Sequence, residues 1–340
     1  MKKLKDPKLV VQAAPFLQQG LTTPKAMLDV IYALIPVTLA SVWFFGLSVL
    51  LILIVSIAGA VMTEWLFSPT SNRSESLWDG SAVLTGLLLG LTLPPSLPLW
   101  MAFIGSVVGV GLGKVMWGGL GNNLFNPALL GRAFLLANFP NAMTTWVPQA
   151  ESGGLFHLHA SNFAWPFMQA PVDAVTTATP LGLMKFQQQD TPLFDLMLGT
   201  TTGSFGETCG LLILIGGIYL ILRRSIDWRV PVAILGTAII FTGLLFMIDS
   251  TRYPDPLFTI FSGGLLLGAF FMATDPVTSP LTPKGTWIFG IGIGIIVILI
   301  RVFGGFPEGM MYAILLMNAT VPLIERYTQP RAFGHGGTAK

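Results

Sequence analysis

The chain has 340 residues, of which 53% are hydrophobic and only 10% are charged, with 18 Lys and Arg against 16 Asp and Glu. Soluble domains carry about 25% charged residues, so this composition excludes a soluble globular domain, and it is too apolar for a disordered chain. The single cysteine, Cys209, excludes a disulfide scaffold, and a net charge of +2 without a dense basic cluster does not indicate nucleic-acid binding. The composition predicts a polytopic membrane protein.

Residues 1–26 form a basic tail ahead of the first apolar segment. The tail begins MKKLKDPK and is not followed directly by an apolar core with a small-residue cleavage site. A signal peptide has both of these features. We therefore predict that the tail is retained and lies in the cytoplasm.

Ten apolar segments follow, and each is long enough, or nearly so, to cross about 30 Å of hydrocarbon as a helix. They lie at 27–46, 47–67, 81–94, 97–116, 122–139, 207–222, 230–249, 257–273, 286–301 and 309–325. The sequence thus predicts an all-α protein with five helices in residues 27–139 and five in residues 207–325. A long outer loop at 140–206 joins the two groups, and residues 326–340 form a C-terminal tail.

The Lys and Arg residues indicate the orientation, because cytoplasmic segments hold an excess of them. With the N-terminus inside, 14 of the 18 fall in inner segments, namely Lys2, Lys3, Lys5, Lys8, Lys25, Arg73, Lys114, Arg223, Arg224, Arg229, Lys284, Arg326, Arg331 and Lys340. The outer segments carry only Lys185 and Arg252, while Arg132 and Arg301 lie within or at the end of spans. We therefore predict that both termini are cytoplasmic and that the loop at 140–206 faces outward.

Glycine patterns recur between the two groups of five spans. Residues 86–90 and 264–268 both read Gly-Leu-Leu-Leu-Gly, the Gly-x-Gly-x-Gly of 109–113 recurs at 290–294, and the Gly-Gly of 118–119 recurs at 304–305. Because five is an odd number, the two groups have opposite orientations in the membrane. Inverted repeats are typical of transporters. Composition and periodicity alone therefore favour a redox-inactive channel or transporter.

The outer loop contains the sequence Asp-Ala-Val-Thr-Thr-Ala-Thr-Pro-Leu at 173–181. Taken by its residues alone, this is a Thr-rich turn closed by Pro180, since no flanking base is placed to activate a threonine. The segment nevertheless resembles the flavin-attachment motif of the RnfD subunits of Rnf-type electron-transport complexes and of the related NqrB subunits. In that family, the last threonine of the motif carries the phosphate of FMN in a phosphoester.

The resemblance implies specific roles for the residues of this motif. Thr179 corresponds to the threonine that carries covalent FMN. Asp173, Thr176, Thr177 and Ala178 correspond to the recognition sequence of the flavin transferase that attaches it.

The resemblance covers nearly the whole chain. Segments 27–36, 121–134, 273–280 and 305–318 are similar to other signatures of the family, and the length and the number of spans agree with RnfD better than with NqrB. The resemblance implies a subunit of an ion-translocating oxidoreductase complex in a bacterial inner membrane, which is not catalytic alone. Such a subunit transfers electrons in coupling ferredoxin/NAD redox chemistry to ion transport.

The same resemblance implies cofactors and partners. It implies a second, non-covalent flavin such as riboflavin, which no residues here locate, and a flavin transferase for maturation. Other subunits would bind NADH, iron–sulfur clusters and a further covalent flavin, because this chain has no Cys cluster of its own. An alternative is a scaffolding subunit whose motif is unused, which would purify with the complex but without colour.

Ionisable residues near spans are candidate functional residues, because charges are costly in lipid. Asp29, Glu64, Arg132, Asp249 and Asp275 qualify, and each could equally cap a helix or lie at the interface. Of these, we predict that Arg132 and Asp275 belong to an intramembrane ion or flavin site.

The Asn126-Pro127 pair predicts the start of a half-helix after a re-entrant stretch at 118–123, since Asn is a preferred N-cap and Pro a preferred first helical residue. His157 and His159 form a His-x-His pair in the outer loop. A third ligand is missing from the sequence around them, so we predict no metal site.

Overall fold

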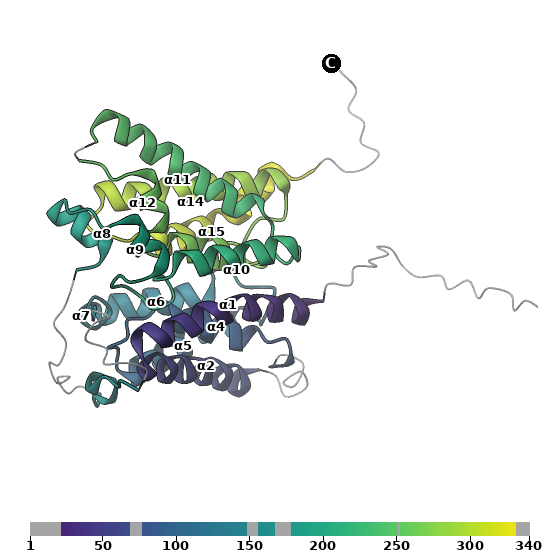
Figure 1. Ribbon diagram of the computed structural model, residues 1–340. Coiled ribbons are helices and arrows are strands. Elements are labelled where there is room, and N and C mark those ends of the chain that lie inside the picture. Colours follow the sequence, from purple (N-terminus) through teal and green to yellow (C-terminus); the bar gives the residue numbers. More distant parts are fainter. Residues whose placement is uncertain (1–21, 69–76, 148–155, 167–177, 251, 331–340) are drawn as a thin grey trace, which may run out of the picture.

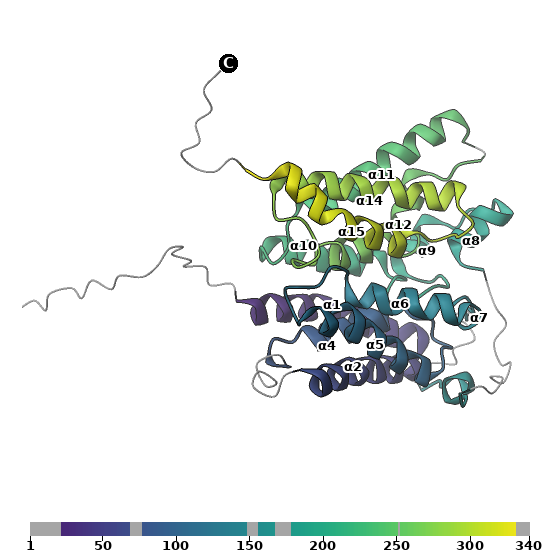
Figure 2. The ribbon, with the colours of Figure 1, turned by 180° about the vertical axis from the view of Figure 1, so that it is seen from behind.

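Residues 22–68, 77–147, 156–166, 178–250 and 252–330 are described by the computed structural model, and the secondary structure within these ranges is helical. Figure 1 shows two layers, in which the helices of the N-terminal half stack on those of the C-terminal half. The first and last described helices begin and end at one end of the molecule. The short helices of the central loop lie at the opposite end, as both views show (Figures 1 and 2).

The N-terminal half contains α1 (Thr23–Phe45), α2 (Leu47–Phe67), α4 (Ser81–Leu91), α5 (Leu99–Gly113), the 3-10 turn η1 (Val115–Trp117) and α6 (Pro127–Asn138). Gly46 separates α1 from α2 with φ +78°, a conformation that glycine adopts without strain. The side chain of Asn126 accepts hydrogen bonds from the backbone N–H groups of Ala128 and Leu129 at 3.0 and 3.3 Å. This N-cap is the helix start that the Asn-Pro pair predicts.

The C-terminal half contains α10 (Gly210–Leu222), α11 (Arg229–Ile248), α12 (Pro256–Phe261), α13 (Leu265–Leu267), the π-helical turn η5 (Gly268–Met272), α14 (Pro283–Phe303) and α15 (Met310–Thr328). The segment predicted as one span at 257–273 is therefore broken between α12 and α13. Gly263 at the break has φ +61°, and the N–H of Gly264 donates to the Glu308 carboxylate at 2.6 Å instead of to a helical carbonyl. A side-chain acceptor thus replaces the helical one at this point.

The central loop carries α7 (Pro140–Met143), the 3-10 turn η3 (Ala160–Phe163), α8 (Pro180–Gly182), the π-helical turn η4 (Leu183–Gln187) and α9 (Leu193–Leu198). Its described parts are anchored on different halves. The backbone N–H of His159 donates to Ser48 Oγ in α2 at 2.9 Å, and the Asn162 amide donates to two carbonyls of the loop before α5 at 3.0 and 2.8 Å. In contrast, the Lys185 ammonium in η4 donates to carbonyls at and beyond the end of α14.

Each of the ten predicted apolar segments contains helix in the structure, but the helices differ in length. Five described stretches are long and apolar enough to cross a membrane, namely Thr23–Phe45, Leu47–Phe67, Leu99–Trp117, Arg229–Ile248 and Pro283–Phe303. Ser81–Leu91 and Gly210–Leu222 are shorter apolar helices. Large apolar side chains such as Leu39, Trp43 and Ile240 are 65, 67 and 67% exposed, as expected for surfaces that face lipid.

The two halves use the same order of helix packing. In the first half α2 packs on α4 and α5, and α5 packs on α6; in the second half α11 packs on α12 and α14, and α14 packs on α15. Across the interface α1 packs on α10, and α6 packs on α15. The recurring glycines meet different partners, however, because a Cβ on Gly109 would contact α6 whereas a Cβ on Gly290 would contact α11.

Candidate functional site

Thr179 is the N-cap of α8, which continues directly into η4. Its side-chain Oγ1 accepts a hydrogen bond from the N–H of Gly182 at 3.2 Å, and its carbonyl accepts from the N–H of Leu183 at 2.8 Å. The preceding residue, Ala178, is exposed, and its carbonyl accepts from the hydroxyl of Thr202 at 3.0 Å. The Thr179 hydroxyl oxygen acts as an acceptor in this cap, so replacing its proton by another group leaves the cap bond intact.

Thr179 lines a cavity with about 920 Å³ of free space counted to its open mouth. That is room for roughly thirty waters at about 30 Å³ each. Most of the wall is apolar and includes Leu136, Met143, Trp146, Leu196, Phe261, Phe306, Met311 and Tyr312. The hydroxyl groups of Thr201, Thr202 and Ser204 also line the cavity. A mostly apolar cavity with a few polar groups on its wall is typical of a site for a planar organic cofactor.

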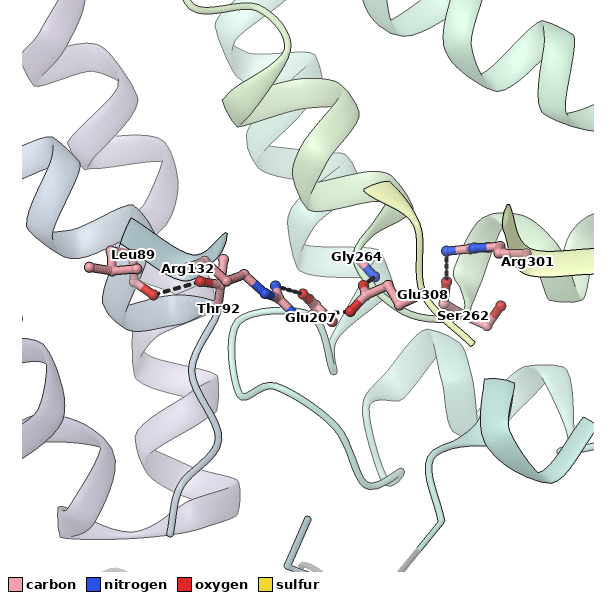
Figure 3. A network of polar contacts seen from close by, with 8 residues as sticks. All are labelled: Leu89, Thr92, Arg132, Glu207, Ser262, Gly264, Arg301 and Glu308. Atoms are coloured by element: carbon pink, nitrogen blue, oxygen red, sulfur yellow. Dashed lines mark hydrogen bonds and ion pairs between the residues drawn. The ribbon is translucent and has the colours of Figure 1, made fainter. Parts of the chain in front are cut away.

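Arg132 of α6 lines the same cavity and is 11% exposed. Its Nη1 donates to Glu207 Oε1 and its Nη2 donates to Glu308 Oε2, both at 2.8 Å (Figure 3). Glu207 lies just before α10 and Glu308 just before α15, so a cation of the N-terminal half is held by two carboxylates of the C-terminal half. Charge-assisted hydrogen bonds of this kind are among the stronger ones in proteins.

The polar network continues past the two carboxylates. Glu308 Oε1 accepts from the backbone N–H of Gly264, and the buried Arg301 donates to the carbonyls of Thr259 and Ser262 at 2.7 and 3.0 Å. In Figure 3, the charged groups follow one another in the order Arg132, Glu207, Glu308 and Arg301. Two cations and two carboxylates therefore balance each other, which lowers the cost of burying them.

Gly264 is required by the close approach of the two acids. A Cβ at this position would lie 2.6 Å from Glu308 Oε1 and 2.8 Å from Glu207 Oε1. Both distances are below van der Waals contact. The Gly-Leu-Leu-Leu-Gly sequence at 264–268 thus serves the charged network at its first glycine, in addition to close packing at its last.

Asp275 lies elsewhere in the molecule. It lines a separate cavity together with Lys114, Asn123 and Asn126. Its carboxylate accepts from the N–H of Val277 and from the hydroxyl of Thr278, both at 3.2 Å. The structure therefore brings Arg132 together with Thr179 and places Asp275 in another cavity. Three residues of the attachment motif, Asp173, Thr176 and Thr177, lie outside the described residues.

Several charged residues of these sites escape the sequence reasoning. Glu207 and Glu308 are not among the predicted site residues, although Glu308 lies in the 305–318 segment that carries part of the resemblance. Lys114, counted among the inner cations, is 1% exposed and donates to Glu64 at 2.6 Å and to Ser81 Oγ at 2.5 Å. Glu64 is also 1% exposed. Neither pairing has a local signal, because the partners are far apart in the chain.

Comparison with known proteins identifies relatives over the full length, each of them the D component of a membrane complex. The model of the NQR2, RnfD, RnfE family matches residues 10–334. The chain is 42% identical over 334 residues to the component from the proton-translocating ferredoxin:NAD(+) oxidoreductase complex of Clostridium ljungdahlii, covering 95% of this chain and 96% of that one. It is 39% identical over 332 residues to that of the Na(+)-translocating ferredoxin:NAD(+) oxidoreductase complex of Acetobacterium woodii, covering 96% and 95%. It is also 41% identical over 331 residues to that of the ion-translocating oxidoreductase complex of Stutzerimonas stutzeri, covering 93% of each.

Proposed function

Because this chain belongs to the NQR2, RnfD, RnfE family, we propose that it is the RnfD-type subunit of an ion-translocating ferredoxin:NAD(+) oxidoreductase complex and carries FMN as a phosphoester on Thr179. The observation that carries the proposal is the position of Thr179 on the wall of the 920 Å³ cavity. The relatives named above are subunits of such complexes and are similar over more than nine tenths of the chain.

The residues around Thr179 fit a covalently attached flavin. The Thr179 oxygen can become the ester oxygen and still accept from the Gly182 N–H. The large apolar walls suit an isoalloxazine ring, while the hydroxyls of Thr201 and Thr202 can bond to its polar edge. FMN accepts one or two electrons and so can connect one-electron with two-electron carriers.

Arg132 gives this cavity a fixed positive group. Its two carboxylate partners hold the guanidinium in one orientation, with the charged network balanced on the side away from the cavity. A preorganised cation beside a redox cofactor stabilises negative charge there without further reorganisation. We propose that Arg132 acts on the flavin in this way, and that Asp275 belongs to a different part of the ion or flavin path.

For the membrane topology, we propose ten spans in two inverted repeats, residues 27–139 and 207–325, with the tails at 1–26 and 326–340 in the cytoplasm of a bacterial cell. The equivalent order of helix packing in the two halves supports the repeat. The location of the described chain ends at one end of the molecule, opposite the short loop helices, supports the orientation (Figure 1). The loop at 140–206, with Thr179, then lies on the periplasmic side of the inner membrane.

The proposed role requires partners. Electrons reach and leave this subunit through others that bind NADH, iron–sulfur clusters and a second covalent flavin. A flavin transferase is needed for maturation. A non-covalent riboflavin in this subunit stays a prediction without assigned residues.

The test is attachment of the flavin at one named atom. The full chain is expressed with a flavin transferase as wild type, as Thr179→Val, and as Thr144→Val, which alters another threonine of the same cavity wall. Intact mass and in-gel fluorescence should show one FMN adduct, less water, on wild type and Thr144→Val, and none on Thr179→Val. Equal loss in both variants would contradict the assignment of Thr179. A colourless wild type with an active transferase would favour a redox-inactive channel, transporter or scaffold.

A further inference from the structure

A second cavity lies beside that of Thr179, between α11, α12, α14 and η4. It has about 1060 Å³ of free space counted to its mouth. Leu181 and Pro307 line both cavities and therefore form the partition between them. The other apolar residues of its wall include Met184, Phe258, Ile298, Val302 and Phe303.

The polar side of this second cavity is cationic. Lys185, Arg252 and Arg301 line it, and Asp and Glu are absent from its lining in the described chain. Lys185 and Arg252 are the two Lys and Arg residues of the segments predicted to face outward, although the chain has 18 in all. Outer segments of membrane proteins are poor in such residues, so the convergence of both on one cavity indicates a site for an anion.

The three cations have no carboxylate partner within the part of the chain that the structure describes. The Lys185 ammonium donates to the carbonyls of Ile300, Gly304 and Phe306 at 3.3, 2.5 and 2.9 Å, and burial lowers its pKa. Two nitrogens of Arg301 bind carbonyls, but its buried Nε has no hydrogen-bond partner.

The third cation is the exposed Arg252, whose guanidinium lies 5.7 Å from the ring centroid of Tyr253. Near it, the end of α11 presents Met247 and Ile248, which are 84 and 77% exposed. A cationic rim is thus combined with apolar walls and with an apolar surface outside the mouth. This combination matches a molecule with a charged head and a hydrocarbon tail.

We propose that this cavity binds the phosphate headgroup of one anionic phospholipid of the outer leaflet. The phosphate lies among the three cations, and the acyl chains leave along α11 into the membrane. The site does not involve Thr179, so the assignment holds whether or not flavin is attached. It gives the outer end of the C-terminal half a bound lipid that contacts the partition next to the proposed flavin cavity.

The first measurement uses the purified full chain in detergent. Its thermal unfolding is followed with phosphatidylglycerol, with phosphatidylcholine of the same acyl chains, and with inorganic phosphate. Phosphatidylglycerol should raise the Tm more than either of the others, and native mass spectrometry should retain one copy per chain. Equal effects of the two lipids, or an effect of inorganic phosphate as large as that of phosphatidylglycerol, would overturn the assignment.

Variants separate this site from general attraction of anionic lipid. Arg252→Gln should weaken phosphatidylglycerol binding roughly fivefold, Arg252→Lys should retain it, and Arg326→Gln, an exposed arginine of α15 away from the cavity, should leave it unchanged. Equal weakening by Arg252→Gln and Arg326→Gln would refute a localised site. Loss of the preference in a flavin-free Thr179→Val chain would show instead that the cations serve the flavin phosphate.

Discussion

Removing the positive charge of Arg132 should destabilise the contact between the two halves. In Arg132→Met, Glu207 and Glu308 keep their positions on either side of Gly264 but lose the cation that neutralises both. Removing one partner of a buried ion pair costs about 3–5 kcal/mol. Because Glu308 is 23% exposed and can be hydrated, we expect the lower end, about 3 kcal/mol of unfolding free energy. Reversible unfolding of the purified full chain in mixed detergent measures this loss.

The neutral network provides the matched control. In the triple variant Arg132→Met, Glu207→Gln, Glu308→Gln no charge is left unpaired, so most of the lost stability should return. Glu207→Gln alone should cost less than Arg132→Met, because Arg132 keeps Glu308. A loss below about 0.5 kcal/mol in Arg132→Met, within the range of ordinary surface changes, would refute this reasoning. A triple variant weaker than Arg132→Met would refute it as well.

Three further predictions concern other parts of the molecule. Lys114→Met should lower the unfolding free energy by about 3–5 kcal/mol, and addition of Glu64→Gln should restore much of it, since both side chains are 1% exposed; the same unfolding assay measures both. Gly131→Ala should destabilise the α5–α6 contact, because its Cβ would meet a backbone carbonyl of α5 at 2.5 Å, whereas Gly236→Ala, with nothing within 4 Å, should be neutral or stabilise by up to about 1 kcal/mol; thermal unfolding of the two variants compares them directly. His159 is half-buried beside another histidine, and both effects lower its pKa from 6.5. The η3 anchor should therefore be intact above pH 6.5 and weaken as the pH falls below it, which limited proteolysis of the loop can follow, with His159→Phe expected to show no such pH dependence.

The helices follow closely from the sequence where hydropathy decides them. The predicted spans at 47–67 and 230–249 match α2 and α11 to within a residue, because a lipid-facing helix needs an uninterrupted apolar run. Hydropathy does not report the break at Gly263, since the acceptor that replaces the helical carbonyl is Glu308, 44 residues away. Apolar length alone therefore predicts a continuous helix at that point.

The candidate site divides in the same way. The motif that ends in Thr179 and the charge of Arg132 are visible in the sequence, because each is unusual in its immediate surroundings. That both line one cavity is not visible, since it depends on how α6 packs against α15. The carboxylate partners of Arg132 are likewise hidden, because Glu207 and Glu308 stand at the ends of apolar segments where an acid ordinarily marks an interface.

The ion pairs of Arg132 also impose an order on the synthesis of the chain. Glu207 follows it by 75 residues and Glu308 by 176. At about 5–20 residues per second, the ribosome supplies the first carboxylate roughly 4–15 s after the arginine and the second roughly 9–35 s after it. During this interval, α6 has an unpaired guanidinium that must remain hydrated, so the helix cannot settle at its final depth in lipid. The N-terminal half therefore waits for the C-terminal half before its last helix is fully inserted.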